Sequence, residues 1–159
     1  MNKFWLRCGF SPLVLALVCM IGINAHAQQA SAPEDIPAAH LMQPAELAKV
    51  LSSGGEKPLV LQVGSHVLFA EAHIPGSEYA GAGGTEAGLQ TLRDRVKTLD
   101  HATAIIIYCG CCPWVKCPNI RAAYRQLSSL GFTNVKALYI AANFGTDWAS
   151  KGYPVEKGR

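Results

Sequence analysis

Short apolar runs alternate along the chain with stretches in which leucine and valine recur at helical spacing. The run at 105–109, Ile-Ile-Ile-Tyr-Cys, carries no charge and is rich in β-branched residues, so we expect a strand buried on both faces. The other predicted strands cover 59–63 and 135–140. The predicted helices cover 44–51, 86–99, 120–130 and 143–150, and 64–72 is a loop or short helix.

Strands that alternate with helices indicate an α/β domain whose sheet is mainly parallel. Right-handed crossover connections place helices on both faces of such a sheet. The alternation spans 44–157, which we predict to be a single domain. A segment of this length is enough for one hydrophobic core.

The first 27 residues have the pattern of a secretory signal peptide. Lys3 and Arg7 form a basic start, an apolar run follows, and Ala25-His26-Ala27 matches a small-x-small cleavage site. The apolar run is short for a membrane span. We therefore predict a periplasmic or secreted protein that is free of the membrane after cleavage, with an uncleaved anchor as the alternative. Residues 28–43, polar and rich in Pro and Ala, are predicted to be a flexible tether.

The charge balance bears on the class of partner. The chain has 14 Lys and Arg residues against 11 Asp and Glu, and two of the basic residues lie in the predicted signal peptide. No basic tract is present in the rest of the sequence, so nucleic acid is not an expected partner.

The cysteines outside the predicted signal peptide are crowded into one short stretch. The chain has six cysteines, and these four are Cys109, Cys111, Cys112 and Cys117. An even number in an exported protein ordinarily indicates disulfides. Four close neighbours cannot join distant parts of a fold, however, so their crowding favours a reactive or metal-binding site.

Cys109 has the placement of a reactive cysteine, because it ends a predicted parallel strand shortly before a helix. Open α/β sheets carry their sites beyond the carboxyl ends of the strands. The helix that follows offers unpaired backbone N–H groups and the positive end of its dipole. Both favour the thiolate, which is the nucleophilic form of cysteine.

Several segments, in the same order along the chain, resemble the rhodanese family of sulfurtransferases. The segment 59–63 lies where that family has its first core strand, and 105–109 resembles the strand that delivers its catalytic cysteine. Ala72-His73-Ile74-Pro75-Gly76-Ser77 resembles the family's Gly-His-Ile-Pro-Gly-Ala turn, and Trp148 with Gly152-Tyr153-Pro154 resembles its usual ending. The resemblance covers 44–156 and implies a further short strand at 78–82.

The resemblance implies a fold, an activity and a nucleophile. The expected fold is a rhodanese-like single domain. Cys109 would accept sulfane sulfur from a small donor such as a thiosulfonate, hold it as a persulfide, and pass it to a thiol or to cyanide. This chemistry needs no organic cofactor. His73, in the resembling turn, is expected to be structural.

Two departures from the family pattern concern the site itself. The family's Asp-Val-Arg after the first core strand is replaced by Gln62-Val63-Gly64, so a structural ion pair is expected to be missing. The active loop is also enlarged, since Asn119 and Arg121 lie ten and twelve residues after Cys109. The family closes its loop about five or six residues after the cysteine.

The extra cysteines leave several roles open. Cys111, Cys112 and Cys117 could supply a resolving thiol that attacks a persulfide on Cys109, or they could form a disulfide that pins the loop. Four thiols could also hold Cu(I) or Zn(II). The spacing Cys-x-Cys-Cys-x4-Cys is not a standard zinc motif and the loop contains no histidine, so a bound metal is not expected.

The remaining loop residues are candidates for contact with the substrate. They are Gly110, Trp114, Lys116, Asn119 and Arg121. Lys116 and Arg121 could steer an anionic donor or lower a cysteine pKa, or they could be ordinary solvated charges. Trp114 could wall a substrate pocket or cover the apolar side of its own loop.

The sequence thus favours an exported sulfurtransferase, with two rivals on the same fold. One rival is a periplasmic thiol–disulfide or redox-sensing protein that uses the extra cysteines with a redox partner. The other is a non-catalytic binding module whose loop is bridged by a disulfide or filled by a metal.

Overall fold

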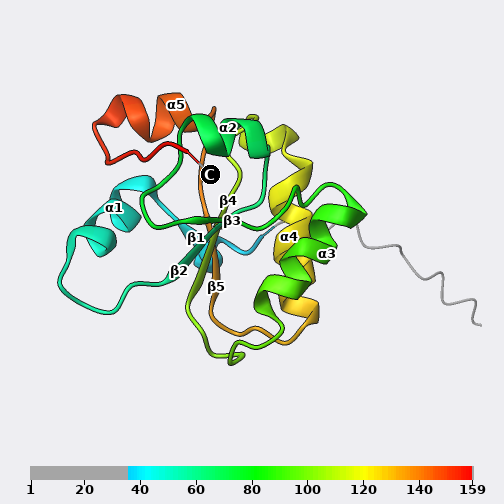
Figure 1. Cartoon of the computed structure of the whole chain (residues 1–159). Coiled ribbons are helices and arrows are strands. Elements are labelled where there is room, and N and C mark those ends of the chain that lie inside the picture. Colours follow the sequence, from blue (N-terminus) through cyan, green and yellow to red (C-terminus); the bar gives the residue numbers. More distant parts are fainter. Residues whose placement is uncertain (1–35, 159) are drawn as a thin grey trace, which may run out of the picture. The chain divides into compact units, whose positions relative to one another are not determined.

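The chain folds around a five-stranded sheet in which every strand is parallel to its neighbours (Figure 1). The computed structural model describes residues 36–158. The strands are β1 (Leu41–Met42), β2 (Leu59–Gln62), β3 (Glu78–Tyr79), β4 (Ile105–Tyr108) and β5 (Val135–Leu138), in the order β1-β5-β4-β2-β3 across the sheet. β4 lies at the centre, with Ile105 paired to Leu59 of β2 on one side and to Val135 of β5 on the other.

Helices cover both faces of the sheet, as predicted. They are α1 (Pro44–Ser52), α2 (His66–Glu71), α3 (Glu86–Val96), α4 (Pro118–Ser129) and α5 (Phe144–Asp147), with short 3-10 turns at Ala38–His40, Trp114–Lys116 and Ala149–Lys151. Figure 1 shows α3 and α4 together on one side of the strands and α1 and α5 on the other.

Alternation along β4 divides its side chains between two hydrophobic cores. Ile105, Ile107 and Cys109 belong to the core that α3 and α4 cover. Ile106 and Tyr108 belong to the core on the opposite face, which α1 covers. All five residues are buried, which is the usual state of a central strand in a parallel sheet. The alternation therefore places Cys109 on the α4 side of the sheet.

The structure confirms the predicted α/β class and the predicted strands and helices, with ends that differ by a few residues. The strand predicted at 78–82 is present as β3 but is only two residues long, and the segment 64–72 contains α2. Trp148, in the closing segment, is fully buried.

The folded domain begins earlier than its predicted start at Pro44. Both residues of β1 pair with β5, and Ile36 is buried in the core beneath α3 and α4. Residues 36–43 therefore belong to the domain and not to the tether predicted over 28–43. The physical reason is that the edge of β5 offers unpaired backbone groups, which even a very short strand can satisfy.

The predicted signal peptide, residues 1–27, lies outside the described residues, and so does the first part of the predicted tether. Across 36–158, no helix combines the length and the apolar character needed to cross a membrane.

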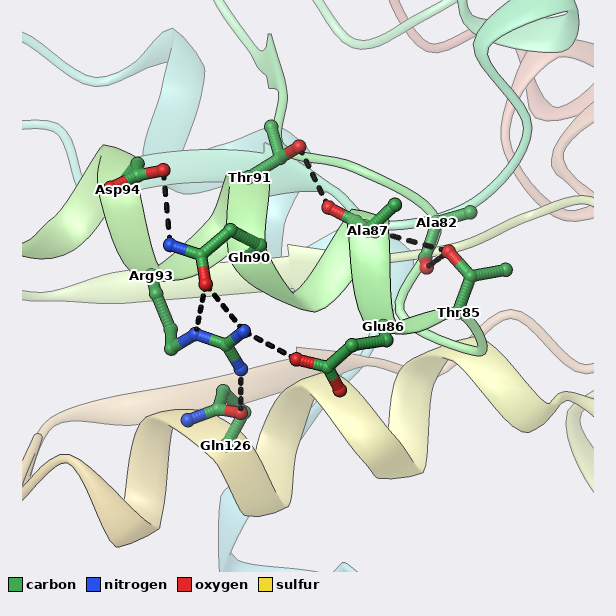
Figure 2. A network of polar contacts seen from close by, with 10 residues as sticks. Ala82, Thr85, Glu86, Ala87, Gln90, Thr91, Arg93, Asp94 and Gln126 are labelled. Atoms are coloured by element: carbon green, nitrogen blue, oxygen red, sulfur yellow. Dashed lines mark hydrogen bonds and ion pairs between the residues drawn. The ribbon is translucent and has the colours of Figure 1, made fainter.

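A polar network on the surface connects α3 to α4 (Figure 2). Arg93 of α3 donates to Gln126 of α4 at 3.0 Å, and also to Glu86 and Gln90 on its own helix at 2.5 and 2.6 Å. Glu86 is mostly exposed, and an exposed ion pair of this kind contributes at most about 1 kcal/mol. The network adds a polar contact to the apolar packing between α3 and α4, whose first turn borders the cysteine loop.

Tyr108 connects the end of β4 to the turn at 73–77. Its hydroxyl oxygen accepts a hydrogen bond from the Ile74 N–H at 3.2 Å and lies 3.1 Å from Ser77 Oγ. Burial raises the pKa of this phenol to about 12, so Tyr108 is neutral at neutral pH. These contacts position the residue that immediately precedes Cys109.

Tyr108→Phe should lower the free energy of unfolding by about 1–3 kcal/mol, because it leaves the buried Ile74 N–H without its acceptor. Urea denaturation measures this difference. Tyr153→Phe is a matched control, since the Tyr153 ring packs against Trp148 and its hydroxyl takes no part in this network. Its effect should stay within about 0.5 kcal/mol. Equal losses in the two variants would contradict the role given to Tyr108.

Candidate active site

The chain turns sharply after Cys109, and a glycine makes this turn possible. Gly110 has φ +72°, a left-handed conformation that residues with side chains rarely adopt. A Cβ atom on Gly110 would lie 2.8 Å from Cβ of Phe144. The Gly110 carbonyl accepts a hydrogen bond from the Phe144 N–H at 2.9 Å. The predicted loop residue Gly110 is thus required for the path of the chain and packs against the start of α5.

Two residues at the end of β2 hold Cys109 from the neighbouring strand, and neither was a predicted site residue. Gln62 is buried; its Nε2 donates to the Cys109 carbonyl at 3.3 Å, and its Oε1 accepts from the Gly64 N–H at 3.1 Å. A Cβ atom at Gly64 would lie 2.9 Å from Cys109 Sγ. The signal in the sequence that could have identified these residues was the departure from the Asp-Val-Arg pattern. The neutral amide of Gln62 bonds the backbone, and Gly64 leaves room for the sulfur atom of Cys109.

All four cysteines of the loop have free thiols and lie close together. Cys109 Sγ lies 3.0 Å from Cys111 Sγ, which lies 3.6 Å from Cys112 Sγ. The Sγ atoms of Cys109, Cys112 and Cys117 all lie within 4.8 Å of one another. The loop therefore brings the predicted nucleophile together with all three predicted partners.

Asn119, in the first turn of α4, faces two of these sulfur atoms. Its side-chain amide donates to Cys109 Sγ at 3.4 Å and to Cys111 Sγ at 3.5 Å. Its Oδ1 accepts from the Gly84 N–H at 2.8 Å, which fixes the orientation of the amide group. Asn119 can therefore stabilise negative charge on either sulfur atom.

Cys117 lies at the N-cap of α4, where the thiolate form is favoured. A hydrogen bond from the Cys109 thiol, with further ones from the backbone N–H groups of Ile120 and Asn119, lowers the pKa of Cys117 to about 6. The hydrogen bond to Cys117, together with burial, raises the pKa of Cys109. The N-terminus of α4 therefore favours the thiolate at Cys117, its N-cap residue, and not at Cys109 as the sequence predicted. Burial, followed by hydrogen bonding to its neighbours, raises the pKa of Cys112 to about 12.

Trp114 and Arg121 hold the loop against the domain. Arg121 Nη1 donates to the Trp114 carbonyl at 2.7 Å, and its guanidinium carbon lies 5.4 Å from the centroid of the Trp114 ring. Trp114 is buried and packs against Tyr139, with ring centroids 5.1 Å apart. Of the two roles considered for Trp114, covering the apolar side of its own loop agrees with this packing. Lys116 is exposed.

A hollow of about 460 Å³ opens over Cys109 at the carboxyl edge of the sheet. Cys109 and Cys111 line it from the loop, and Phe144 lines it from α5. Cys112 and Cys117 instead border a gap beneath the loop that is too narrow for a water molecule. A small molecule in the hollow would therefore meet Cys109 and Cys111 but not the other two thiols.

His73 lies in the turn that precedes β3 and does not line this hollow. Its Nδ1 lies 2.8 Å from the Phe69 carbonyl, and its ring stacks on the Phe69 ring. Its Nε2 lies 3.8 Å from a Glu156 carboxylate oxygen. These contacts are those of a structural residue that joins the turn to α2 and to the C-terminal segment.

The architecture is similar to that of several solved structures. The Alr3790 protein from Anabaena sp. is 21% identical, with 74% of this chain and 92% of that chain covered and a TM-score of 0.58. The BH2092 protein from Bacillus halodurans is 24% identical, with 74% and 77% covered and a TM-score of 0.58. The rhodanese-like domain of Alr3790, solved by solution NMR, is 20% identical, with 74% and 79% covered and a TM-score of 0.56. No family model and no curated protein matches the sequence.

The chain therefore has the rhodanese-like fold, as the sequence predicted. The loop that follows its central strand carries the cysteine cluster.

In the reduced, metal-free protein, one thiolate per molecule should form as the pH rises through about 6, because Cys117 has a lowered pKa. Thiolate absorbance in the ultraviolet measures this titration. Cys117→Ser should remove the step, whereas Cys111→Ser should keep it. Absence of any thiolate below the ordinary cysteine pKa of about 8.5 would contradict the assignment.

Proposed function

We propose that the protein is an exported sulfurtransferase that carries sulfane sulfur as a persulfide on Cys109. One observation carries this proposal: Cys109 follows the central strand of a rhodanese-like sheet and lines the hollow at its carboxyl edge. A sulfur donor in the hollow can meet Cys109 directly. Export rests on the signal-peptide pattern of residues 1–27.

The proposed reaction has two steps at the same sulfur atom. The Cys109 thiol gives its proton to the Cys117 thiolate, with which it is hydrogen-bonded, and its sulfur attacks the outer sulfur of a thiosulfonate such as thiosulfate. A bond forms between the two sulfur atoms, and the bond from the outer sulfur to the sulfonyl group breaks, so that sulfite leaves with the electron pair. A thiolate or cyanide then attacks the outer sulfur and restores the Cys109 thiolate.

Two hydrogen-bond donors favour negative charge on sulfur at Cys109, against the burial and the Cys117 contact that raise the pKa of its thiol. The Asn119 amide and the Cys111 backbone N–H both donate toward Cys109 Sγ. Hydrogen bonds from fixed N–H groups stabilise an anionic sulfur without a nearby cation. The absence of a side chain at Gly64 leaves the sulfur atom the space that a Cβ atom would occupy.

A second candidate function is thiol–disulfide exchange, which the short distance between Cys109 and Cys111 favours. Their sulfur atoms lie 3.0 Å apart, and both line the hollow. The Cys111 thiolate would attack Cys109 Sγ of a persulfide, form a disulfide and release hydrosulfide. An external dithiol, such as a periplasmic redox partner, would then reduce the disulfide and be oxidised in turn.

Cys109→Ser should lower the rate of sulfite release from thiosulfate, with cyanide as acceptor, by at least about a hundredfold, because it removes the nucleophile. Cys112→Ser is the matched control and should keep most of the rate, because Cys112 does not line the hollow. Full activity of Cys109→Ser, together with loss of activity in Cys112→Ser, would show that Cys109 is not the nucleophile. If the reaction instead requires Cys111 and a dithiol, thiol–disulfide exchange is the better account.

A further inference from the structure

Three thiols from different parts of the loop converge on one point. Cys109 follows β4, Cys112 lies within the loop, and Cys117 immediately precedes α4. Their Sγ atoms all lie within 4.8 Å of one another. Among residues 36–158, this is the one group of three or more His, Cys, Asp or Glu side chains gathered in this way.

We propose that Cys109, Cys112 and Cys117 form a binding site for a thiophilic d10 cation, Cu(I) or Zn(II). Thiolate sulfur is a preferred ligand of both ions. A Zn–S bond of about 2.3 Å places the sulfur atoms of a tetrahedral site about 3.8 Å apart. The three sulfur atoms therefore need to approach one another by about 1 Å at most, which small changes in the side-chain dihedral angles can supply.

The surroundings of the cluster suit a cation held by thiolates. Trp114, Ile120 and Leu138 enclose its inner side, where the gap is too narrow for a water molecule. Exclusion of water strengthens the attraction between a cation and its thiolate ligands. The N–H groups at the start of α4, a helix of 12 residues, offset the excess negative charge of three thiolates.

A disulfide accounts for this arrangement less well than a metal does. A disulfide within the cluster would join two of the sulfur atoms and leave the third with only Cys111, outside the cluster, as a further partner. A cation uses all three as thiolates and releases their remaining protons, without any change in oxidation state. Cys111 lies outside the three-sulfur group and remains beside Cys109 at the hollow.

The site shares Cys109 with sulfur transfer, and in this one respect the inference rests on the proposed function. A lone pair of Cys109 Sγ that binds the cation is not available to attack a donor. Bound metal should therefore block the loading of sulfur. By linkage, the factor by which bound metal lowers the equilibrium constant for persulfide formation is also the factor by which a persulfide on Cys109 weakens metal binding.

The test is a titration of the reduced, metal-free protein with Cu(I) in the absence of oxygen and, separately, with Zn(II), each against a chromophoric chelator. We expect one ion per molecule. Cys112→Ser should weaken binding by at least about a hundredfold because it removes a ligand, whereas the matched Cys111→Ser, which removes only a neighbour of Cys109, should weaken it clearly less. The titration whose stoichiometric binding depends on Cys112 identifies the ion.

X-ray absorption spectroscopy of the metal-bound wild-type protein is a test that needs no variant. It should show that the protein ligands of the ion are sulfur atoms. Binding of neither ion, or equal affinity in the wild type and Cys112→Ser, would overturn the proposal. Loading of sulfur from thiosulfate is measured on the same metal-free samples. If the protein takes up sulfur from thiosulfate but binds no metal, only the metal site is overturned. If it binds metal but takes up no sulfur, only the proposed function is overturned.

Discussion

Burial of β4 on both faces fixes where the reactive sulfur lies. β4 pairs with β2 on one side and with β5 on the other, and all of its residues are buried. Such a strand cannot shift its register by one residue without exchanging the side chains that fill its two cores. Each of these large apolar side chains stabilises the fold by about 1.5–3 kcal/mol when buried. The direction of Cys109 is therefore set by the packing of a whole strand, before any contact of the loop is considered.

Three side chains hold the enlarged loop, one at the end of β2 and two in the first turn of α4. Gln62 bonds the Cys109 carbonyl from β2, Arg121 bonds the Trp114 carbonyl from α4, and Asn119 approaches the sulfur atoms from the first turn of α4. Two of the four thiols, Cys109 and Cys111, border the hollow. Cys112 and Cys117 border the narrow gap beneath the loop. Cys109 borders both spaces, so one sulfur atom can take part in transfer on the outer side and in metal binding on the inner side.

The parts of this molecule that follow from local sequence were the ones that could be predicted. The apolar run of β4, the helical spacing of α3 and the position of Cys109 directly after β4 depend on neighbouring residues, and all three agree with the fold. β1 was not predicted, because a strand of two residues has no periodicity of its own and depends on pairing with β5, almost 100 residues further along the chain. The bond from Gln62 to the Cys109 carbonyl likewise joins residues that only the sheet brings together. The convergence of three thiols was not predictable either, because the left-handed turn at Gly110 and the packing of the loop determine it, while the spacing of the cysteines does not.

The most direct test of the central claim, that Cys109 carries sulfur, is the intact mass of the reduced protein before and after thiosulfate and then after a reductant. The account predicts a gain of one sulfur atom per molecule, which the reductant removes and which Cys109→Ser does not show. No gain of sulfur would contradict the account. A loss of hydrogen atoms that the reductant restores, without any gain of sulfur, would show that the loop acts through disulfides alone.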